Sequence, residues 1–269
     1  MRILFLTHAF NSLTQRLFVE LRERGYEVAV EYDINDAVAL EAVGLCRPEL
    51  IIAPFLKRAI PEAIWRRHTC LVVHPGIPGD RGPSSLDWVI LNGERRWGVT
   101  VLQANGEMDA GDIWASVGFE MRESAKGSLY RHEVTDAAVA AVLMALDRIL
   151  AGDYQPQPLH DVDPGIRGGW RPMMRQQDRA IDWQHEETAT ILRKIRSTDG
   201  APSVKARLLD SEYYLYDARP EPLLHGNPGE LIARCGPAIC RATLDGAVWI
   251  GHLRENRGEL SFKLPATHR

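Results

Sequence analysis

The chain has few cysteines and no long apolar run. Of its 269 residues only four are cysteine (Cys46, Cys70, Cys235 and Cys240), and none forms a C-x-x-C pair. A zinc site is therefore not expected, and we interpret the four as buried thiols of a cytoplasmic protein. No apolar run approaches the length that spans a bilayer. The N-terminal MRILFLTHAF predicts a first strand rather than a signal peptide.

Several catalytic and binding motifs are also missing. The chain contains no G-x-G-x-x-G and no G-x-x-x-x-G-K-[ST], so dinucleotide-binding and P-loop functions have no support. It contains no G-x-S-x-G, the turn that carries a hydrolase serine. The nine histidines form no H-x-x-x-H or H-x-H pair, so no metal is expected. A net charge of −4 argues against general nucleic-acid binding.

What the first part of the chain does contain is a regular alternation of strand and helix patterns. This alternation predicts an α/β fold with a doubly wound, mostly parallel sheet and right-handed crossovers. The expected strands are 2–7, 26–32, 49–55, 70–74, 97–103 and 112–121. The expected helices are 14–24, 35–46, 61–67, 84–93 and 128–152.

The pattern changes after residue 152. Residues 153–180 are rich in proline and glycine and are expected to be a connector, and 188–198 predict one more helix. Short alternating segments then fill 203–264, which is typical of a small β-barrel or sandwich. We therefore expect three parts: an α/β domain at 1–165, a linker and helix at 166–202, and a small β-domain at 203–269.

Two side chains in loops are candidates for proton transfer. His74 directly follows the strand 70–74, and Asp109 lies in the loop after the strand 97–103. In a parallel sheet both strands would end at one edge, where ligands bind, and a histidine beside a carboxylate is the minimum for acid–base work. The alternative is that His74 only caps backbone groups and that Asp109 is an ordinary turn residue. Asp112 ranks behind Asp109 because it begins the next strand.

The motifs around these residues resemble those of the folate-dependent formyltransferases. They are HPGIPGDRGPSSLDW (74–88), GVTV (98–101) and MDAGDI (108–113). Residues 51–65 resemble the segment before that family's catalytic strand, and 179–202 resemble its linker and helix. The resemblance implies a Rossmann-like domain followed by a barrel-like, OB-type domain, and N10-formyltetrahydrofolate as donor. It implies His74 and Asp109 as catalytic residues, and as folate-binding residues Pro75, Gly76, Ile77, Arg81 and Asp112.

One position departs from the family pattern. The family carries an Asn two residues before its His, and here that position is Val72. The segments 74–88 and HAFNSLTQR (8–16) are most similar to the hydrogenase maturation formyltransferases of the HypX/HoxX type. That branch passes the formyl group on to make the carbon monoxide ligand of nickel–iron hydrogenase. It implies coenzyme A as acceptor, hydrogenase maturation proteins as partners, and a downstream enoyl-CoA-hydratase-like domain.

An anionic acceptor would find donors at the start of the first helix. Asn11, Ser12, Gln15 and Arg16 lie there, and Arg131 lies near the start of the long helix. The alternative is ordinary capping and solvated surface. Two other functions stay open: a formyltransferase acting on a sugar amine or methionyl-tRNA, and a non-catalytic folate-binding module. The excess of acidic residues before residue 166 counts against tRNA.

Overall fold

The computed structural model describes residues 1–200, 203–208, 211–256 and 262–268. It divides into two compact units, the first comprising 1–85, 95–121 and 130–172, and the second 86–94, 122–129 and 173–269. The predicted boundaries at 165 and 202 follow chain order. In the structure, the internal segments 86–94 and 122–129 belong to the second unit. The predicted C-terminal domain includes 209, 210, 257–261 and 269, which lie outside the described residues.

A mixed six-stranded sheet forms the first unit. Its order is β2-β1-β3-β4-β5-β6, and the strands are β1 (Arg2–Thr7), β2 (Glu27–Tyr32), β3 (Leu50–Phe55), β4 (Cys70–His74), β5 (Arg96–Gln103) and β6 (Ile113–Glu120). The first four are parallel, while β5 and β6 are antiparallel to their neighbours. The predicted fold class is confirmed.

The expectation that β4 and β5 run parallel is wrong. Leu71 pairs with Gln103 and His74 with Thr100, so the carboxyl ends of the two strands lie at opposite edges. A parallel pair requires a crossover that carries the chain back across the sheet. The intervening helix α4 (Ser85–Asn92) falls instead in the second unit from Leu86 onward. The chain therefore re-enters the sheet from the edge at which β4 ended.

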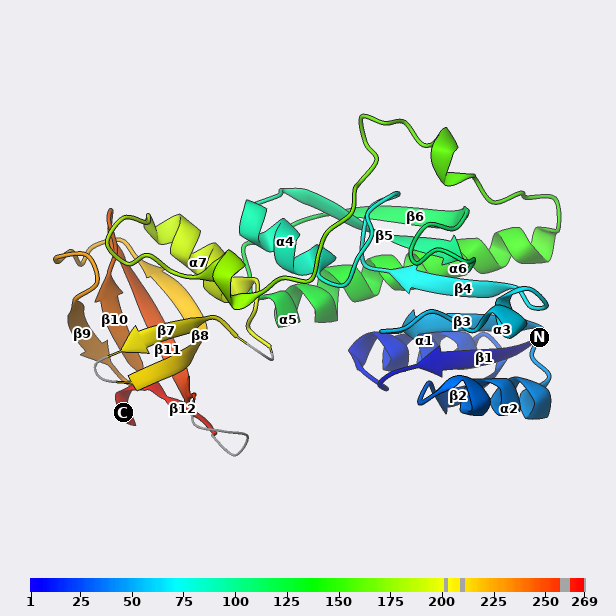
Figure 1. The fold of residues 1–269 in the computed structure, drawn as a ribbon, viewed down its shortest axis with the longest axis horizontal. Coiled ribbons are helices and arrows are strands. Elements are labelled where there is room, and N and C mark those ends of the chain that lie inside the picture. Colours follow the sequence, from blue (N-terminus) through cyan, green and yellow to red (C-terminus); the bar gives the residue numbers. More distant parts are fainter. Residues whose placement is uncertain (201–202, 209–210, 257–261, 269) are drawn as a thin grey trace. The chain divides into compact units, whose positions relative to one another are not determined.

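Helices cover both faces of this sheet, as expected of a doubly wound fold (Figure 1). On one face α1 (Ser12–Glu23) contacts β2, β3 and α6 (Thr135–Ala151), and α6 contacts β5 and β6. On the other face α2 (Asp36–Cys46) contacts β1, β2 and the short α3 (Glu62–Trp65). Leu4 and Leu6 alternate out of β1 onto the α2 face, where they pack with Ala39 and Val43.

The predicted single helix at 128–152 is wrong in its first two turns. It begins as α5 (Lys126–Leu129), continues as a π-helical segment, η1 (Tyr130–Val134), and becomes regular only in α6. Gly152 ends α6 in the left-handed conformation, as its sequence predicts. Within the ranges described, no helix is long and apolar enough to cross a membrane.

The second unit contains α7 (Thr188–Arg196) and an antiparallel sheet. The order is β7-β8-β11-β10-β9, with β12 on β11. The strands are β7 (Lys205–Leu208), β8 (Ser211–Glu221), β9 (Leu231–Cys235), β10 (Ala238–Ala242), β11 (Ala247–Glu255) and β12 (Lys263–Pro265). One face of α7 packs Ile191, Leu192 and Ile195 into the core of this sheet. Among the described residues, 3-10 turns lie at η2 (Leu159–Asp161) in the first unit and at η3 (Gln176–Arg179) and η4 (Ala266–His268) in the second.

The expectation of four buried thiols is only partly correct. Cys70 and Cys240 are buried and Cys46 is half-buried, but Cys235 is exposed. Cys235 is the last residue of β9 and pairs with Ala238 across a tight turn at Gly236. A strand end beside a turn leaves its side chain in solvent, which the alternating sequence pattern alone does not reveal.

Candidate active site

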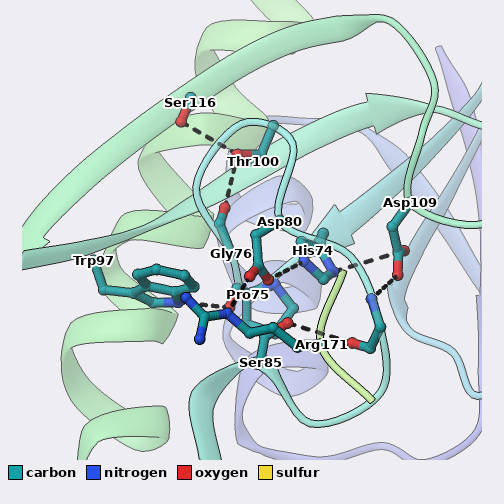
Figure 2. A network of polar contacts seen from close by, with 11 residues as sticks. His74, Pro75, Gly76, Asp80, Ser85, Trp97, Thr100, Asp109, Ser116 and Arg171 are labelled. Carbon is teal, nitrogen blue, oxygen red and sulfur yellow. Dashed lines mark hydrogen bonds and ion pairs between the residues drawn. The ribbon is translucent and has the colours of Figure 1, made fainter. Parts of the chain in front are cut away.

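His74 lies at the carboxyl end of β4, with only 5% of its surface exposed, between two carboxylates (Figure 2). Its Nε2 is 3.0 Å from Oδ2 of Asp80, which lies six residues further along the loop. Its Nδ1 is 3.6 Å from Oδ1 of Asp109. The predicted histidine and carboxylate are therefore within reach of each other, and a second carboxylate completes the cluster.

Asp109 reaches His74 by a route that the sequence pattern does not suggest. Because β5 is antiparallel to β4, the loop after β5 starts at the far edge and must fold back towards His74. Asp109 adopts a left-handed backbone conformation at φ +55°, which Asp tolerates better than most residues. Its Oδ2 accepts a hydrogen bond from the Gly82 amide at 3.3 Å, which ties this loop to the loop after His74.

Asp80 and Arg171 are site residues that sequence reasoning missed. The Asp80 side chain is fully buried, and its Oδ1 accepts a hydrogen bond from Nε of Arg171 at 2.7 Å. The Arg171 guanidinium also lies over the Trp97 ring, 5.0 Å from its centroid. Arg171 belongs to the proline- and glycine-rich segment that was expected to be only a connector. The sequence offers only an arginine directly after Gly-Gly-Trp. No neighbouring residue indicates that its partner is Asp80.

The loop after His74 is held by donors from β5. Thr100 Oγ1 donates to the Gly76 carbonyl at 2.7 Å, and Trp97 Nε1 donates to the Pro75 carbonyl at 3.0 Å. A Cβ at Gly76 would overlap both the His74 ring and the Asp80 carboxylate, so only glycine fits. The backbone of the loop is thus fixed on one side by β5 and on the other by the imidazole–carboxylate pair.

A cavity of about 60 Å³ lies next to this cluster. Asp109 and Val72 line it, and Val72 stands on the same face of β4 as His74 because side chains alternate along a strand. Its remaining lining is mostly apolar, with one cation and three other polar side chains: Leu56, Arg58, Ala59, Ile60, Leu102, Gln103, Ala104, Asn105, Glu107, Met108 and Gly111. The cavity therefore offers a mostly apolar slot with the Asp109 carboxylate at one wall, while the guanidinium of Arg58 pairs with Asp33 and Asp36.

Across the described ranges, no cluster of His, Cys, Asp or Glu side chains has the geometry of a metal site.

Comparisons with known proteins agree with this geometry. The family model for Formyl transferase matches residues 30–146, and that for Formyl transferase, C-terminal domain, matches residues 173–263. Together they cover more than half of the chain. The chain belongs to the formyl transferase family.

Individual relatives extend this assignment. The hydrogenase maturation factor HoxX of Bradyrhizobium diazoefficiens is 58% identical over 99% of this chain and 46% of its own. The crystal structure of HypX from Aquifex aeolicus in complex with tetrahydrofolic acid matches with a TM-score of 0.93 and 48% identity, over 100% of this chain and 46% of that one. Methionyl-tRNA formyltransferase from Clostridium thermocellum shares the fold, with a TM-score of 0.65, 20% identity and coverage of 90% and 100%. The chain thus spans about half the length of its hydrogenase maturation relatives.

In this formyl transferase chain, four of the five predicted folate-binding residues lie in the loop after His74, and the fifth, Asp112, directly precedes β6. Pro75 and Gly76 present their carbonyls to β5, and Arg81 pairs with Glu107. Ile77 lies near Gly98, and Asp112 is exposed. The described cavity lining includes none of the five, so their role stays a prediction. The segment 51–65, which carried part of the family resemblance, supplies Leu56, Arg58 and Ile60 instead.

The predicted acceptor-binding residues gather around the start of α1. Asn11 caps that helix through the Thr14 amide at 3.0 Å, and its Nδ2 donates to the Tyr130 hydroxyl at 3.1 Å. Tyr130 precedes Arg131 in the π-helical segment, so Asn11 and Arg131 come from neighbouring elements. Gln15 donates to the Phe10 carbonyl at 2.7 Å, and Arg16 pairs with Glu20 at 2.8 Å. Ser12 is the first helical residue.

Proposed function

We propose that this protein transfers a formyl group from N10-formyltetrahydrofolate to an acceptor, and that the acceptor is coenzyme A. The observation that carries the proposal is the His74–Asp109 pair at 3.6 Å beside a mostly apolar cavity that Asp109 itself lines. A relative of 48% identity over the whole chain has been crystallised with tetrahydrofolic acid, which supports the folate half of the proposal.

The proposed reaction needs one proton carrier and one polarising group. As the thiol sulfur attacks the formyl carbon, His74 takes the thiol proton and a C–S bond forms. The C–N10 bond then breaks, and His74 returns the proton to N10, which leaves tetrahydrofolate and formyl-coenzyme A. Asp109 holds the imidazole in place and stabilises its charged form. Protons and bonds balance without a metal or redox partner.

The composition of the cavity lining, rather than its volume of about 60 Å³, suits the pterin ring of a folate. A pterin ring needs an apolar slot with a few polar side chains, which Ile60, Leu102 and Met108 offer together with Gln103 and Asn105. We propose that an amide N–H of Gln103 or Asn105 stabilises the oxyanion, because Val72 cannot.

Coenzyme A is the finer part of the proposal. Its phosphates require cations and backbone donors, and the start of α1 together with Arg131 offers both. By analogy with the hydrogenase maturation relatives, we propose that the product serves the synthesis of the carbon monoxide ligand in the cytoplasm. Hydrogenase maturation proteins and an enoyl-CoA-hydratase-like domain in the full-length protein belong to the same proposal.

A mass-spectrometric acceptor screen tests this proposal. The protein is incubated with N10-formyltetrahydrofolate and, in separate reactions, coenzyme A, a nucleotide-linked amino sugar or methionyl-tRNA. We expect formyl-coenzyme A and tetrahydrofolate in equal amounts, and none with the His74→Gln variant. Formylation of the sugar amine or tRNA alone would overturn the acceptor and keep the donor. Folate binding without transfer to any acceptor would make the protein a folate-binding module.

A further inference from the structure

Four ionisable side chains form an unbroken line through the site. Arg171 Nε contacts Asp80 Oδ1 at 2.7 Å, Asp80 Oδ2 contacts His74 Nε2 at 3.0 Å, and His74 Nδ1 faces Asp109 Oδ1 at 3.6 Å (Figure 2). Exposure rises from the fully buried Asp80 side chain through 5% for His74 to 13% for Asp109, while the Arg171 side chain on the far side of Asp80 is 20% exposed. The imidazole therefore has a closed side towards Asp80 and an open side towards Asp109 and the cavity.

The hydrogen-bonding capacity of each group determines that the imidazole nitrogen facing Asp80 carries a hydrogen. A carboxylate only accepts hydrogen bonds, and Arg171 can only donate. With Asp80 Oδ1 accepting from Arg171, Oδ2 also acts as an acceptor, so the His74 Nε2 must carry a hydrogen. A neutral imidazole with its hydrogen on Nε2 leaves a lone pair on Nδ1. That lone pair faces Asp109 at a distance too long for a direct hydrogen bond, which leaves it available for a proton.

From this arrangement we propose that Asp80 and Arg171 are positioning residues which hold the proton on Nε2 of His74 and make Nδ1 the nitrogen that exchanges protons with substrate. The inference rests on the proposed formyl transfer and deepens it. It assigns the acid–base atom, and it makes Arg171 part of the site although that residue is more than ninety positions from His74. In the reaction above, the thiol proton passes to Nδ1 and from Nδ1 to the folate N10.

Several backbone hydrogen bonds hold Arg171 in place. The segment 167–171, named the strap here, pairs its backbone with the loop after His74: Gly168 N donates to Pro78 O at 2.8 Å, Arg81 N to Gly169 O at 3.1 Å, and Arg171 N to Arg81 O at 2.8 Å. A Cβ at Gly82 would overlap the Arg171 carbonyl, so the two backbones approach as closely as glycine permits. A merely solvated arginine would not require this.

Two variants and a matched control test the assignment. Asp80→Asn keeps the shape but can turn its amide N–H towards His74, which would reverse the tautomer. Arg171→Lys keeps the charge but replaces a directional donor by a compact ammonium group. Arg167→Gln removes an exposed cation from the same strap and is the control. The readouts are kcat, the Kd for tetrahydrofolate, and the ¹⁵N chemical shifts of the His74 ring, assigned with His74→Gln. Circular dichroism melting checks that each variant folds.

We expect a protonated Nε2 in the wild type and an unprotonated Nε2 in Asp80→Asn. The kcat of Asp80→Asn should fall about 10²-fold and that of Arg171→Lys about tenfold, with the Kd for tetrahydrofolate unchanged, while Arg167→Gln keeps the wild-type kcat. If Asp80→Asn does not fold, Arg171→Lys decides. An unprotonated Nε2 in the wild type, or an unchanged kcat in the folded variants, overturns the assignment. If the wild type transfers no formyl group but its Nε2 is protonated, the proposed function is wrong and the assignment of the proton stands.

Discussion

At the scale of single residues, Asp109 combines a functional side chain with an unfavourable backbone. Its φ of +55° is one that Asn and Asp tolerate and that costs other side chains about 1 kcal/mol. We therefore predict that Asp109→Asn keeps the wild-type melting temperature and lowers kcat by about 10²-fold. Asp109→Ala should lose both activity and stability, because it also removes the acceptor for the Gly82 amide. Calorimetry and steady-state kinetics separate the two effects, and an Asn variant with full kcat would remove Asp109 from the mechanism.

Two glycines give a second prediction at this scale. A Cβ at Gly76 would strike the His74 ring and Asp80, whereas a Cβ at Gly44, within α2, meets nothing within 4 Å. Gly76→Ala should therefore lower kcat at least tenfold through displacement of His74. Gly44→Ala should leave kcat unchanged and raise the free energy of unfolding by about 0.5–1 kcal/mol, because alanine favours helix. Equal kinetics in the two variants would show that the loop after His74 adapts freely.

These residues also show what the sequence could and could not predict. His74 and Asp109 were identifiable because each stands in a loop with recognisable neighbours, and the structure brings them together. Asp80 was not, because Asp-Arg-Gly is an ordinary turn sequence and its partner Arg171 lies 91 positions away. A contact between two loops depends on how both fold, and local pattern carries no record of it.

At the scale of elements, the π-helical segment before α6 is the clearest irregularity. It holds Tyr130, whose hydroxyl accepts from Asn11 at the start of α1, and burial raises the pKa of Tyr130 to about 12. The hydrophobic pattern of 128–152 predicts one continuous helix, and it contains no signal for the extra residue that a π turn inserts. The antiparallel direction of β5 could not be predicted either, because the alternating pattern of a strand is the same in both directions.

The Tyr130 contact leads to a prediction on stability. At pH 7, Tyr130→Phe should cost about 0.5–1.5 kcal/mol through the lost hydrogen bond. The folded state holds the phenol neutral up to about pH 12, while the unfolded chain ionises near 10. The raised pKa therefore stabilises the fold below pH 10, and that contribution disappears as pH rises to 12. Denaturant unfolding from pH 9 to 12 should show the wild-type advantage over Tyr130→Phe shrinking, and a constant difference would contradict the burial of the phenol.

At the scale of the whole molecule, the α/β class and the antiparallel C-terminal sheet followed from the sequence, because periodicity switches after residue 152 from alternating elements to short strands. The assignment of two early segments to the second unit could not be predicted from the sequence. Residues 86–94 and 122–129 lie within the first half of the chain but pack with the second unit. There Lys126 pairs with Asp87 at 2.5 Å, and the Gly127 amide donates to Asp199 at 2.9 Å. A single boundary along the chain cannot describe a unit built from three separate segments.

Truncation distinguishes the two divisions of the chain. If the domain prediction of 1–165 is right as a folding unit, a fragment ending at Pro172 should fold and bind tetrahydrofolate, since it retains His74, Asp109 and Arg171. We expect it to fail, because removing 173–269 strips 86–94 and 122–129 of the unit in which they are packed. The exposed apolar side chains Leu86 and Leu129, both buried in the intact chain, would then favour aggregation. Near-ultraviolet circular dichroism and titration calorimetry decide the matter. A cooperative, folate-binding fragment would show that residues 1–172 fold independently and that 86–94 and 122–129 do not depend on residues 173–269.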